Sequence, residues 1–164
     1  MRVPRRAAAS FSPRRHEGRL DAAGLRLGVV CARWNPTVTD AMLAAALDTL
    51  RRRGARSGDV EVVRVPGAFE VPAGAKALAE SGRFDAVVVL AAIVRGETSH
   101  HEVLGHSVAA ALAHLSVDGG VPVGFGILTC DTMDQARARS DKGVEAAEAA
   151  IEMAHLVRQL KRKA

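Results

Sequence analysis

The amino-acid sequence predicts a three-layer α/β/α protein with a four-stranded parallel sheet, and three observations support this fold class. Short apolar runs alternate with helical patterns in the order β-α-β-α-β-α-β-α-α. Two of the runs, "DAVVVLAAIV" (85–94) and "VPVGFGILTC" (121–130), are apolar throughout, as expected of strands that are buried on both faces. Glycines end two of the helical patterns, at Gly54 and Gly82.

The elements are predicted in order from local patterns. "LRLGVVCARW" (25–34) is the first strand, and Asn35-Pro36 is a turn at the start of a helix with apolar residues at helical spacing. The later elements are a strand at 59–66, a loop and helix at 67–82, a strand at 85–94, a helix at 99–117, a strand at 121–130, a short helix and a long final helix. This succession is typical of a flavodoxin-like protein with helices on both faces of the sheet.

Composition excludes several classes of protein. Hydrophobic residues make up 48% of the chain and charged residues 25%, which is typical of a single soluble domain. No apolar run reaches the roughly 18–20 residues that a membrane span needs, so no membrane partner is expected. Cys31 and Cys130 each lie in an apolar strand, which favours a reducing compartment and a cytoplasmic location.

The positive charge of the chain is concentrated at its N-terminus. Residues 1–20 contain six arginines and one glutamate, whereas acidic and basic side chains balance in the rest of the chain. We therefore predict a disordered basic tail at 1–20 and a single domain at 21–164. The tail lacks the apolar region of a secretory signal, and its prolines disfavour a transit peptide. Nucleic acid is not expected as a partner.

Polar residues gather where the predicted strands end, which is where parallel α/β sheets bind ligands. The segments in question are Trp34-Asn35, Gly67 to Glu70, Arg95 to His100, and Cys130-Asp131 with Arg137, Arg139 and Lys142 close behind.

The segment "SHHEVLGH" invites comparison with a zinc motif. A zinc-binding helix places two histidines four residues apart, but His101 and His106 are five apart and diverge by about 140°. No metal site is therefore expected. His100 differs, because it follows "RGETS" at a helix start, where backbone N–H groups bind anions and a histidine can transfer protons. The alternative is a simple cap at Thr98 or Ser99, with His100 facing solvent.

Other rim residues also allow two interpretations. Trp34 can stack on a planar heterocycle or pack in the core, and Glu70 can accept ligand hydroxyls or begin a helix. Arg139 and Lys142 can bind phosphate or form a solvated charge pair. Because all of them are expected at the edge of the sheet where the strands end, we favour the interpretation that they bind a ligand.

Five blocks of the sequence resemble the lumazine synthase family over residues 25–160. They are "ARWNPTVTDAMLAAAL", "VRVPGAFEVP", "AAIVRGETSHHEVL", "VPVGFGILTCDTMDQA" and "DKGVEAAEAAIEMAHL". The resemblance implies a transferase that acts in the penultimate step of riboflavin biosynthesis, without metal or cofactor. It condenses 5-amino-6-(D-ribitylamino)uracil with 3,4-dihydroxy-2-butanone 4-phosphate, giving 6,7-dimethyl-8-ribityllumazine, phosphate and water.

The resemblance also implies a role for individual residues. His100 matches the histidine that exchanges protons during Schiff-base formation, phosphate elimination and ring closure. The pyrimidine and its ribityl chain are assigned to Trp34, Ala68, Phe69, Glu70, Ala92, Ile93, Val94, Lys142 and a neighbouring subunit's Phe125. The phosphate is assigned to Glu97, Thr98 and Arg139, with Arg137 as a rival to Arg139.

The chain departs from the family pattern at three places. His101 replaces a residue that is usually aromatic, which leaves His100 and His101 as competing proton-transfer groups, and Ser99 replaces a proline. The connection between Arg139 and Lys142 is about five residues shorter than the glycine-rich loop of capsid-forming members. We therefore expect a homopentamer with active sites at subunit interfaces, with a 60-subunit shell as the alternative.

Two other functions stay open at this point. A flavodoxin-like binder of a flavin or nucleotide would bind its ligand without turnover. An inactive shell protein would assemble without catalysis, although retention of His100, Arg139 and Lys142 argues against it.

Overall fold

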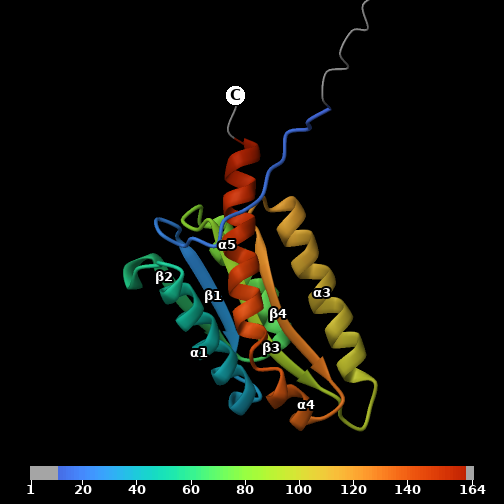
Figure 1. Ribbon diagram of the computed structural model, residues 1–164. Helices are drawn as coiled ribbons and strands as arrows, with labels where there is room; N and C mark the ends of the chain where they lie inside the picture. Colours follow the sequence, from blue (N-terminus) through green and yellow to red (C-terminus); the bar gives the residue numbers. More distant parts are fainter. Residues whose placement is uncertain (1–10, 162–164) are drawn as a thin grey trace, which may run out of the picture.

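The computed structural model describes residues 11–161, and these form a sheet with helices packed on it (Figure 1). The elements are β1 (Leu27–Ala32), α1 (Pro36–Arg52), η1 (Ser57–Asp59), β2 (Val60–Val65), η2 (Ala68–Glu70), α2 (Val71–Glu80), β3 (Ala86–Val94), α3 (His100–Asp118), β4 (Val123–Cys130), α4 (Met133–Ala138) and α5 (Lys142–Lys161). Apart from the two short 3₁₀ helices, this is the order predicted from the sequence.

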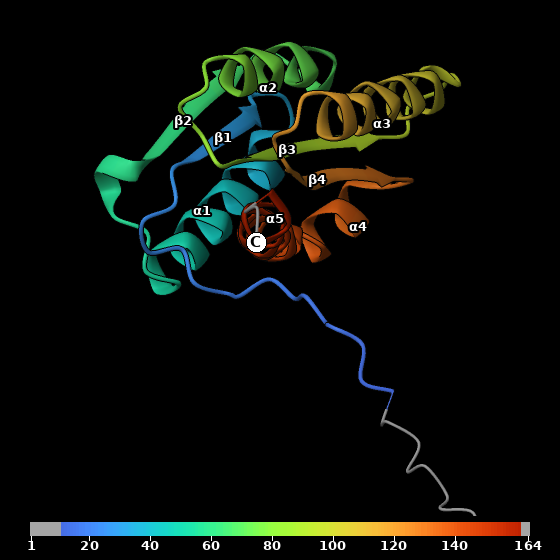
Figure 2. The ribbon, with the colours of Figure 1, turned by 90° about the horizontal axis from the view of Figure 1, so that it is seen from above.

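The four strands form one parallel sheet in the order β2-β1-β3-β4. β1 and β3 are central, and Val29 of β1 pairs with Val62 of β2 on one side and Val88 of β3 on the other. Figure 2 shows α2 and α3 on one face of the sheet, and α1, α4 and α5 on the other. The predicted three-layer, flavodoxin-like α/β/α class is therefore confirmed.

Alternate residues of the central strands supply two separate cores. Val88 and Leu90 of β3 pack with residues of α1 and α5, including Met42 and Ile151. Their neighbours along β3, including Val89, pack on the opposite face with residues of α2 and α3. Because both faces are covered, β3 is apolar almost throughout, as the run at 85–94 predicted.

Glycines allow α5 to lie unusually close to its neighbours. A Cβ atom on Gly143 would come within 2.1 Å of the Met42 carbonyl oxygen in α1. A Cβ atom on Gly124 of β4 would come within 2.1 Å of the Ala146 carbonyl oxygen. Since real Cβ contacts are never that short, any side chain at either position would push α5 away from α1 and the sheet.

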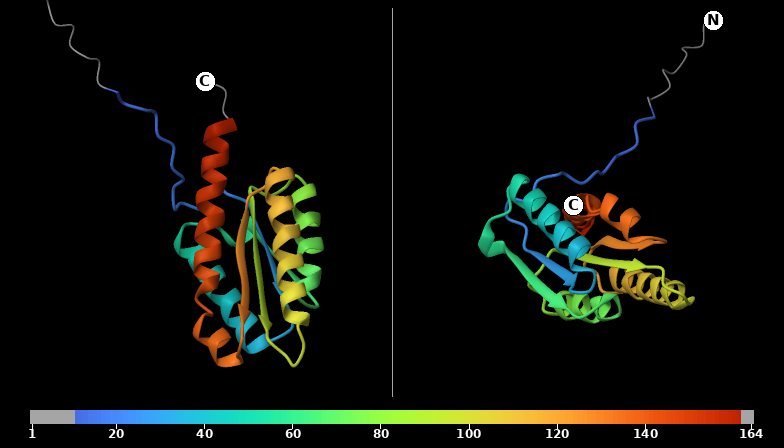
Figure 3. Two further views of the ribbon diagram at one scale, coloured as in Figure 1. Left: turned by 90° about the vertical axis from the view of Figure 1, so that its right-hand side faces the viewer. Right: turned by 90° about the horizontal axis from the view of Figure 1, so that it is seen from below.

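The described part of the predicted tail, residues 11–20, has no helix or strand. The Glu17 carbonyl oxygen accepts a hydrogen bond of 3.0 Å from Gln159 Nε2, so this segment contacts α5. Figure 3 shows the segment at the end of the sheet away from the carboxyl ends of the strands. The first ten residues of the predicted tail lie outside the described residues. None of the described helices is both long and apolar enough to cross a membrane.

Candidate active site

The residues predicted at the rim follow the carboxyl ends of the strands. Backbone pairing continues slightly past the strands, since Trp34 N–H donates to the Pro66 carbonyl at 3.1 Å and Arg95 N–H donates to the Cys130 carbonyl at 2.8 Å. These bonds draw the loops after β1, β2, β3 and β4 to the same edge of the sheet. The loop after β1 thus lies beside that after β2, and the loop after β3 beside that after β4.

The first cavity at this edge has a volume of about 200 Å³. We call it the Trp34 pocket. It is lined by Ala32, Trp34, Asn35, Ala68, Ala92, Ile93, Val94, Gly96, Thr98, His100, His101 and Leu104. The structure therefore brings together seven of the predicted site residues, contributed by the segments after β1 and β2, by β3 with its following loop and by the first residue of α3.

The turn after β1 positions Trp34 at the mouth of this pocket. Asn35 has a left-handed backbone conformation, with φ 57°, which asparagine adopts more readily than most residues. Its carbonyl oxygen accepts from the N–H of Val38 at 2.9 Å, and Pro36 occupies the first turn of α1. Trp34 is 72% exposed, which excludes the alternative of a core residue and leaves its ring free to stack on a ligand.

Glu70 and the tryptophan ring both lie next to Gly67. Glu70 Oε2 accepts a hydrogen bond of 2.9 Å from the Gly67 N–H, and a Cβ atom on Gly67 would be 3.2 Å from Oε2 and 3.7 Å from the Trp34 ring. A carboxylate has further lone pairs, so Glu70 can accept additional bonds from a hydroxylated ligand. Phe69, beside it, is 68% exposed. Of the predicted Ala68–Glu70 segment, Ala68 lines the pocket itself.

The loop after β3 leads into α3 through Thr98 and Ser99. The Ser99 carbonyl accepts from the N–H of Glu102 at 3.0 Å, and Ser99 is the N-cap residue without a side-chain capping bond. Thr98 Oγ1 accepts from the His100 N–H at 3.4 Å. His100 is exposed and lines the Trp34 pocket, so its imidazole is free to exchange protons with a ligand.

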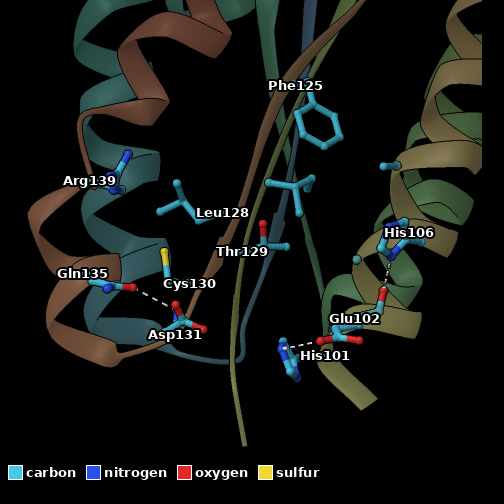
Figure 4. A pocket seen from close by; sticks show the side chains of 13 residues that line it. His101, Glu102, His106, Phe125, Leu128, Thr129, Cys130, Asp131, Gln135 and Arg139 are labelled. Carbon is cyan, nitrogen blue, oxygen red and sulfur yellow. Dashed lines mark hydrogen bonds and ion pairs between the residues drawn. The ribbon is translucent and has the colours of Figure 1, made fainter. Parts of the chain in front are cut away.

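A second cavity of about 880 Å³ follows the edge strand β4 between α3 and α4 (Figure 4). We call it the Phe125 pocket. It is lined by His101, Glu102, Gly105, His106, Ala109, Phe125, Ile127, Leu128, Thr129, Cys130, Asp131, Gln135 and Arg139. Phe125 is 42% exposed on this edge of the sheet. Phe125 and Arg139 are predicted site residues, whereas His106 and Gln135 are not.

The two candidate phosphate ligands have different surroundings. Arg137 donates to Asp134 Oδ1 at 3.0 Å and is held on the surface of α4. Arg139 lines the Phe125 pocket beside Cys130. Burial raises the pKa of the Cys130 thiol, and the charge of Arg139 partly opposes this shift. Arg139 therefore presents its charge to a cavity, whereas the charge of Arg137 is already paired.

Four predicted ligands line neither cavity, namely Phe69, Glu70, Glu97 and Lys142. Lys142 is the first residue of α5, and its Nζ lies 2.5 Å from Glu145 Oε2. Glu97 is an exposed residue of the loop after β3. His101 is the residue that lines both cavities. A single chain therefore does not gather all the predicted site residues around one cavity.

The chemistry available at this edge is that of histidine, arginine and backbone groups. Among residues 11–161, no group of three or more His, Cys, Asp or Glu side chains is arranged to hold a metal ion. Sequence reasoning did not predict the hydrogen bond from Asn35 Nδ2 to the Ala92 carbonyl oxygen, 2.8 Å long, or that His106 lines the Phe125 pocket. Asn-Pro signals a turn, but nothing local to it indicates which carbonyl the asparagine side chain will reach.

A comparison with known families shows which family the chain belongs to. A family model described as 6,7-dimethyl-8-ribityllumazine synthase matches residues 24–158. The match spans both cavities and every element from β1 to most of α5. It also agrees with the sequence blocks that suggested the family. With most of its length matched, the chain belongs to the lumazine synthase family.

Proposed function

We propose that the Trp34 pocket of one subunit and the Phe125 pocket of a neighbouring subunit together form the active site. As a member of the lumazine synthase family, the chain is a transferase of riboflavin biosynthesis. It condenses 5-amino-6-(D-ribitylamino)uracil with 3,4-dihydroxy-2-butanone 4-phosphate to give 6,7-dimethyl-8-ribityllumazine.

The observation that carries this proposal is the division of the site residues between two cavities. His100 lines one cavity and Arg139 the other, although the reaction needs a proton-transfer group and a phosphate ligand on the same substrate. β4 is an edge strand with an exposed aromatic ring, which favours contact with another subunit. A cyclic homo-oligomer would place the Phe125 pocket of one subunit against the Trp34 pocket of the next.

A pentamer is the assembly that we favour. Only Ser140 and Asp141 separate Arg139 from Lys142, so the connection between α4 and α5 is compact. Such a connection lacks the longer glycine-rich loop that is associated with shells. Light scattering separates a pentamer from the 60-subunit alternative.

The pyrimidine substrate fits the Trp34 pocket by its chemistry. Its ring stacks on Trp34, and backbone groups of Ala92, Ile93 and Val94 bind the uracil edge. Asn35 occupies one lone pair of the Ala92 carbonyl, and the other is available to the ligand. The ribityl hydroxyls reach the segment Ala68–Glu70, and Lys142 of the neighbouring subunit approaches the ring.

The phosphate substrate binds where the loop after β3 meets the neighbouring subunit. The N-terminus of α3 offers backbone N–H groups, Thr98 a hydroxyl, and the neighbour's Arg139 a guanidinium that can bind phosphate through two hydrogen bonds. Glu97 lies in the same loop. Held there, the ketone of the phosphate substrate faces the amine of the stacked pyrimidine.

His100 transfers the protons that this condensation requires. It protonates the departing hydroxyl as water leaves and the Schiff base forms, and it removes a carbon-bound proton as phosphate leaves. Loss of phosphate leaves an enol, which tautomerises to a new carbonyl. Attack of the ribityl-bearing nitrogen on this carbonyl closes the ring and releases a second water. Because both substrates are intrinsically reactive, holding them in contact supplies much of the acceleration.

The test is an assay of the full chain with both substrates. We expect formation of the fluorescent lumazine, and His100→Ala should lower kcat by about 100-fold, at the lower end for general acid–base catalysis. His114→Ala, on the same helix and away from both pockets, is the matched control and should leave kcat unchanged. No product under conditions in which another lumazine synthase is active would refute the proposal. A larger loss in His101→Ala than in His100→Ala would move proton transfer to His101.

We also propose that residues 21–164 form one domain preceded by a basic tail, and that the protein works in the cytoplasm. Support for the location comes from Cys31 and Cys130, which are free and buried. No nucleic-acid partner, metal or cofactor is part of the proposal.

A further inference from the structure

We propose that His101 is a positioning residue, which holds the phosphate-binding loop through a hydrogen bond from its imidazole to the Thr98 carbonyl. The loop is Gly96–Ser99, between β3 and α3. This inference rests on the proposed placement of the phosphate at this loop. It gives a function to the residue at which the chain departs from the aromatic side chain usual in its family.

The hydrogen bond joins the imidazole of His101 to the backbone of the loop. His101 Nδ1 lies 3.1 Å from the Thr98 carbonyl oxygen. A carbonyl oxygen only accepts hydrogen bonds, so Nδ1 is the donor in this bond. Nε2 faces Glu102, with 3.9 Å between Nε2 and Oε1 (Figure 4). Phenylalanine has no donor and could not form this bond.

Thr98 is held from two directions. Its carbonyl accepts from the His101 side chain, and its hydroxyl accepts from the His100 N–H at 3.4 Å. The two bonds connect the loop to the first turn of α3, where His100 is located. Thr98 is proposed to bind the phosphate and His100 to transfer protons. Any movement of Thr98 therefore changes the position of the bound phosphate relative to the imidazole of His100.

Packing contributes little to holding this loop. Glu97, Thr98 and His100 are exposed, and a Cβ atom on Gly96 would have no heavy atom within 4 Å. The His101 side chain, in contrast, is only 16% exposed. His101 is thus a mostly buried anchor beneath an exposed loop. Without the bond, the loop would become ordered only when the substrate binds. The conformational entropy lost in that ordering would weaken binding.

The test separates the donor from the ring. His101→Phe keeps an aromatic side chain without a donor, and His101→Asn keeps an N–H group near the position of Nδ1. His101→Gln moves the amide one carbon further from the backbone. The matched controls are His114→Phe and His114→Asn, because His114 lies on the same helix and pairs with Asp118 away from both pockets.

We expect His101→Phe and His101→Gln to raise the KM for the butanone phosphate by about 5- to 10-fold, the loss expected for one hydrogen bond. The KM for the pyrimidine and kcat should stay within about 2-fold. His101→Asn should restore the KM for the phosphate substrate to within about 2-fold of the original value. Light scattering checks that each variant keeps the assembly of the unmodified protein.

Three outcomes would overturn the inference. The first is an unchanged KM for the phosphate substrate in both His101→Phe and His101→Gln. The second is a KM in His101→Asn that is raised as much as in those two variants. The third is a decrease in kcat without any change in KM. The last would assign His101 to proton transfer. If His100→Ala is fully active, the proposed site itself fails. If His100→Ala is impaired while the His101 variants bind phosphate substrate normally, only the role of His101 fails.

Discussion

The side-chain amide of Asn35 donates a hydrogen bond of 2.8 Å from Nδ2 to the carbonyl oxygen of Ala92. This bond joins the end of β1 to β3 at the wall of the Trp34 pocket. It also holds in place the turn that presents Trp34, since Asn35 is the next residue and adopts φ 57°.

Two substitutions separate the backbone conformation of Asn35 from its side-chain bond. Asn35→Gly keeps the left-handed conformation but loses the bond, and should lower the free energy of unfolding by about 1 kcal/mol. Asn35→Ala loses both and should cost about 2–3 kcal/mol. Both should raise the KM for the pyrimidine. Urea denaturation and steady-state kinetics measure these effects. Equal stability of the two variants would show that alanine is not strained in the left-handed conformation at position 35.

Arg139 and Arg137 can be distinguished by kinetics. Arg139→Ala should raise the KM for the butanone phosphate by about 10- to 100-fold, because it removes a charged ligand from the phosphate. Arg137→Ala breaks only a surface ion pair with Asp134. The KM of this variant for the butanone phosphate should therefore stay within about 2-fold of the original value. The KM for the pyrimidine is the internal reference. A larger effect of Arg137→Ala would reverse the assignment.

Mixed oligomers test whether two subunits share one active site. His100→Ala and Arg139→Ala subunits, each impaired alone, should regain activity when they are coexpressed in one assembly. In a ring with random mixing, about a quarter of the interfaces would combine an intact Trp34 pocket with an intact Phe125 pocket. The assay uses tagged subunits and purified hybrids. Activity no higher than the average of the separate variants would place the whole site within one subunit.

Cys31 should make the protein less stable in alkaline solution. Burial raises the pKa of the Cys31 thiol to about 11, so the folded state binds this proton more tightly than the unfolded chain. Its contribution is fully present below the usual thiol pKa and declines as pH rises from that value to about 11. The total loss should be about 1–3 kcal/mol.

Urea denaturation between neutral pH and about pH 10.5 measures this loss. The chain contains no tyrosine, so no phenol titrates in the same range. Cys31→Ala should be less stable at neutral pH but should show a weaker decline with pH. If the free energy of unfolding declines equally with pH in the original protein and in Cys31→Ala, groups other than Cys31 cause the loss of stability in alkaline solution.

Local patterns were sufficient to predict the elements and their order. Apolar runs such as 85–94 identify buried strands, because a strand covered on both faces needs apolar residues at every position. Pro36 and Gly54 were interpreted correctly at the ends of the first helix, since proline suits the first turn and glycine the left-handed conformation after the last. The rule for parallel sheets also located the rim correctly.

The chain by itself therefore determined the α/β/α class, the family and the set of residues at the strand ends, since these depend on local spacing and on matches along the sequence. Only the tertiary structure decided how those residues are divided between the Trp34 pocket and the Phe125 pocket. Phe125 on β4 and Arg139 at the end of α4 line a separate cavity from the Trp34 pocket, because the strand order places β4 outside β3. The bonds of Asn35 to Ala92 and of His101 to Thr98 depend on side-chain directions and on how the loops converge, which residue spacing does not encode.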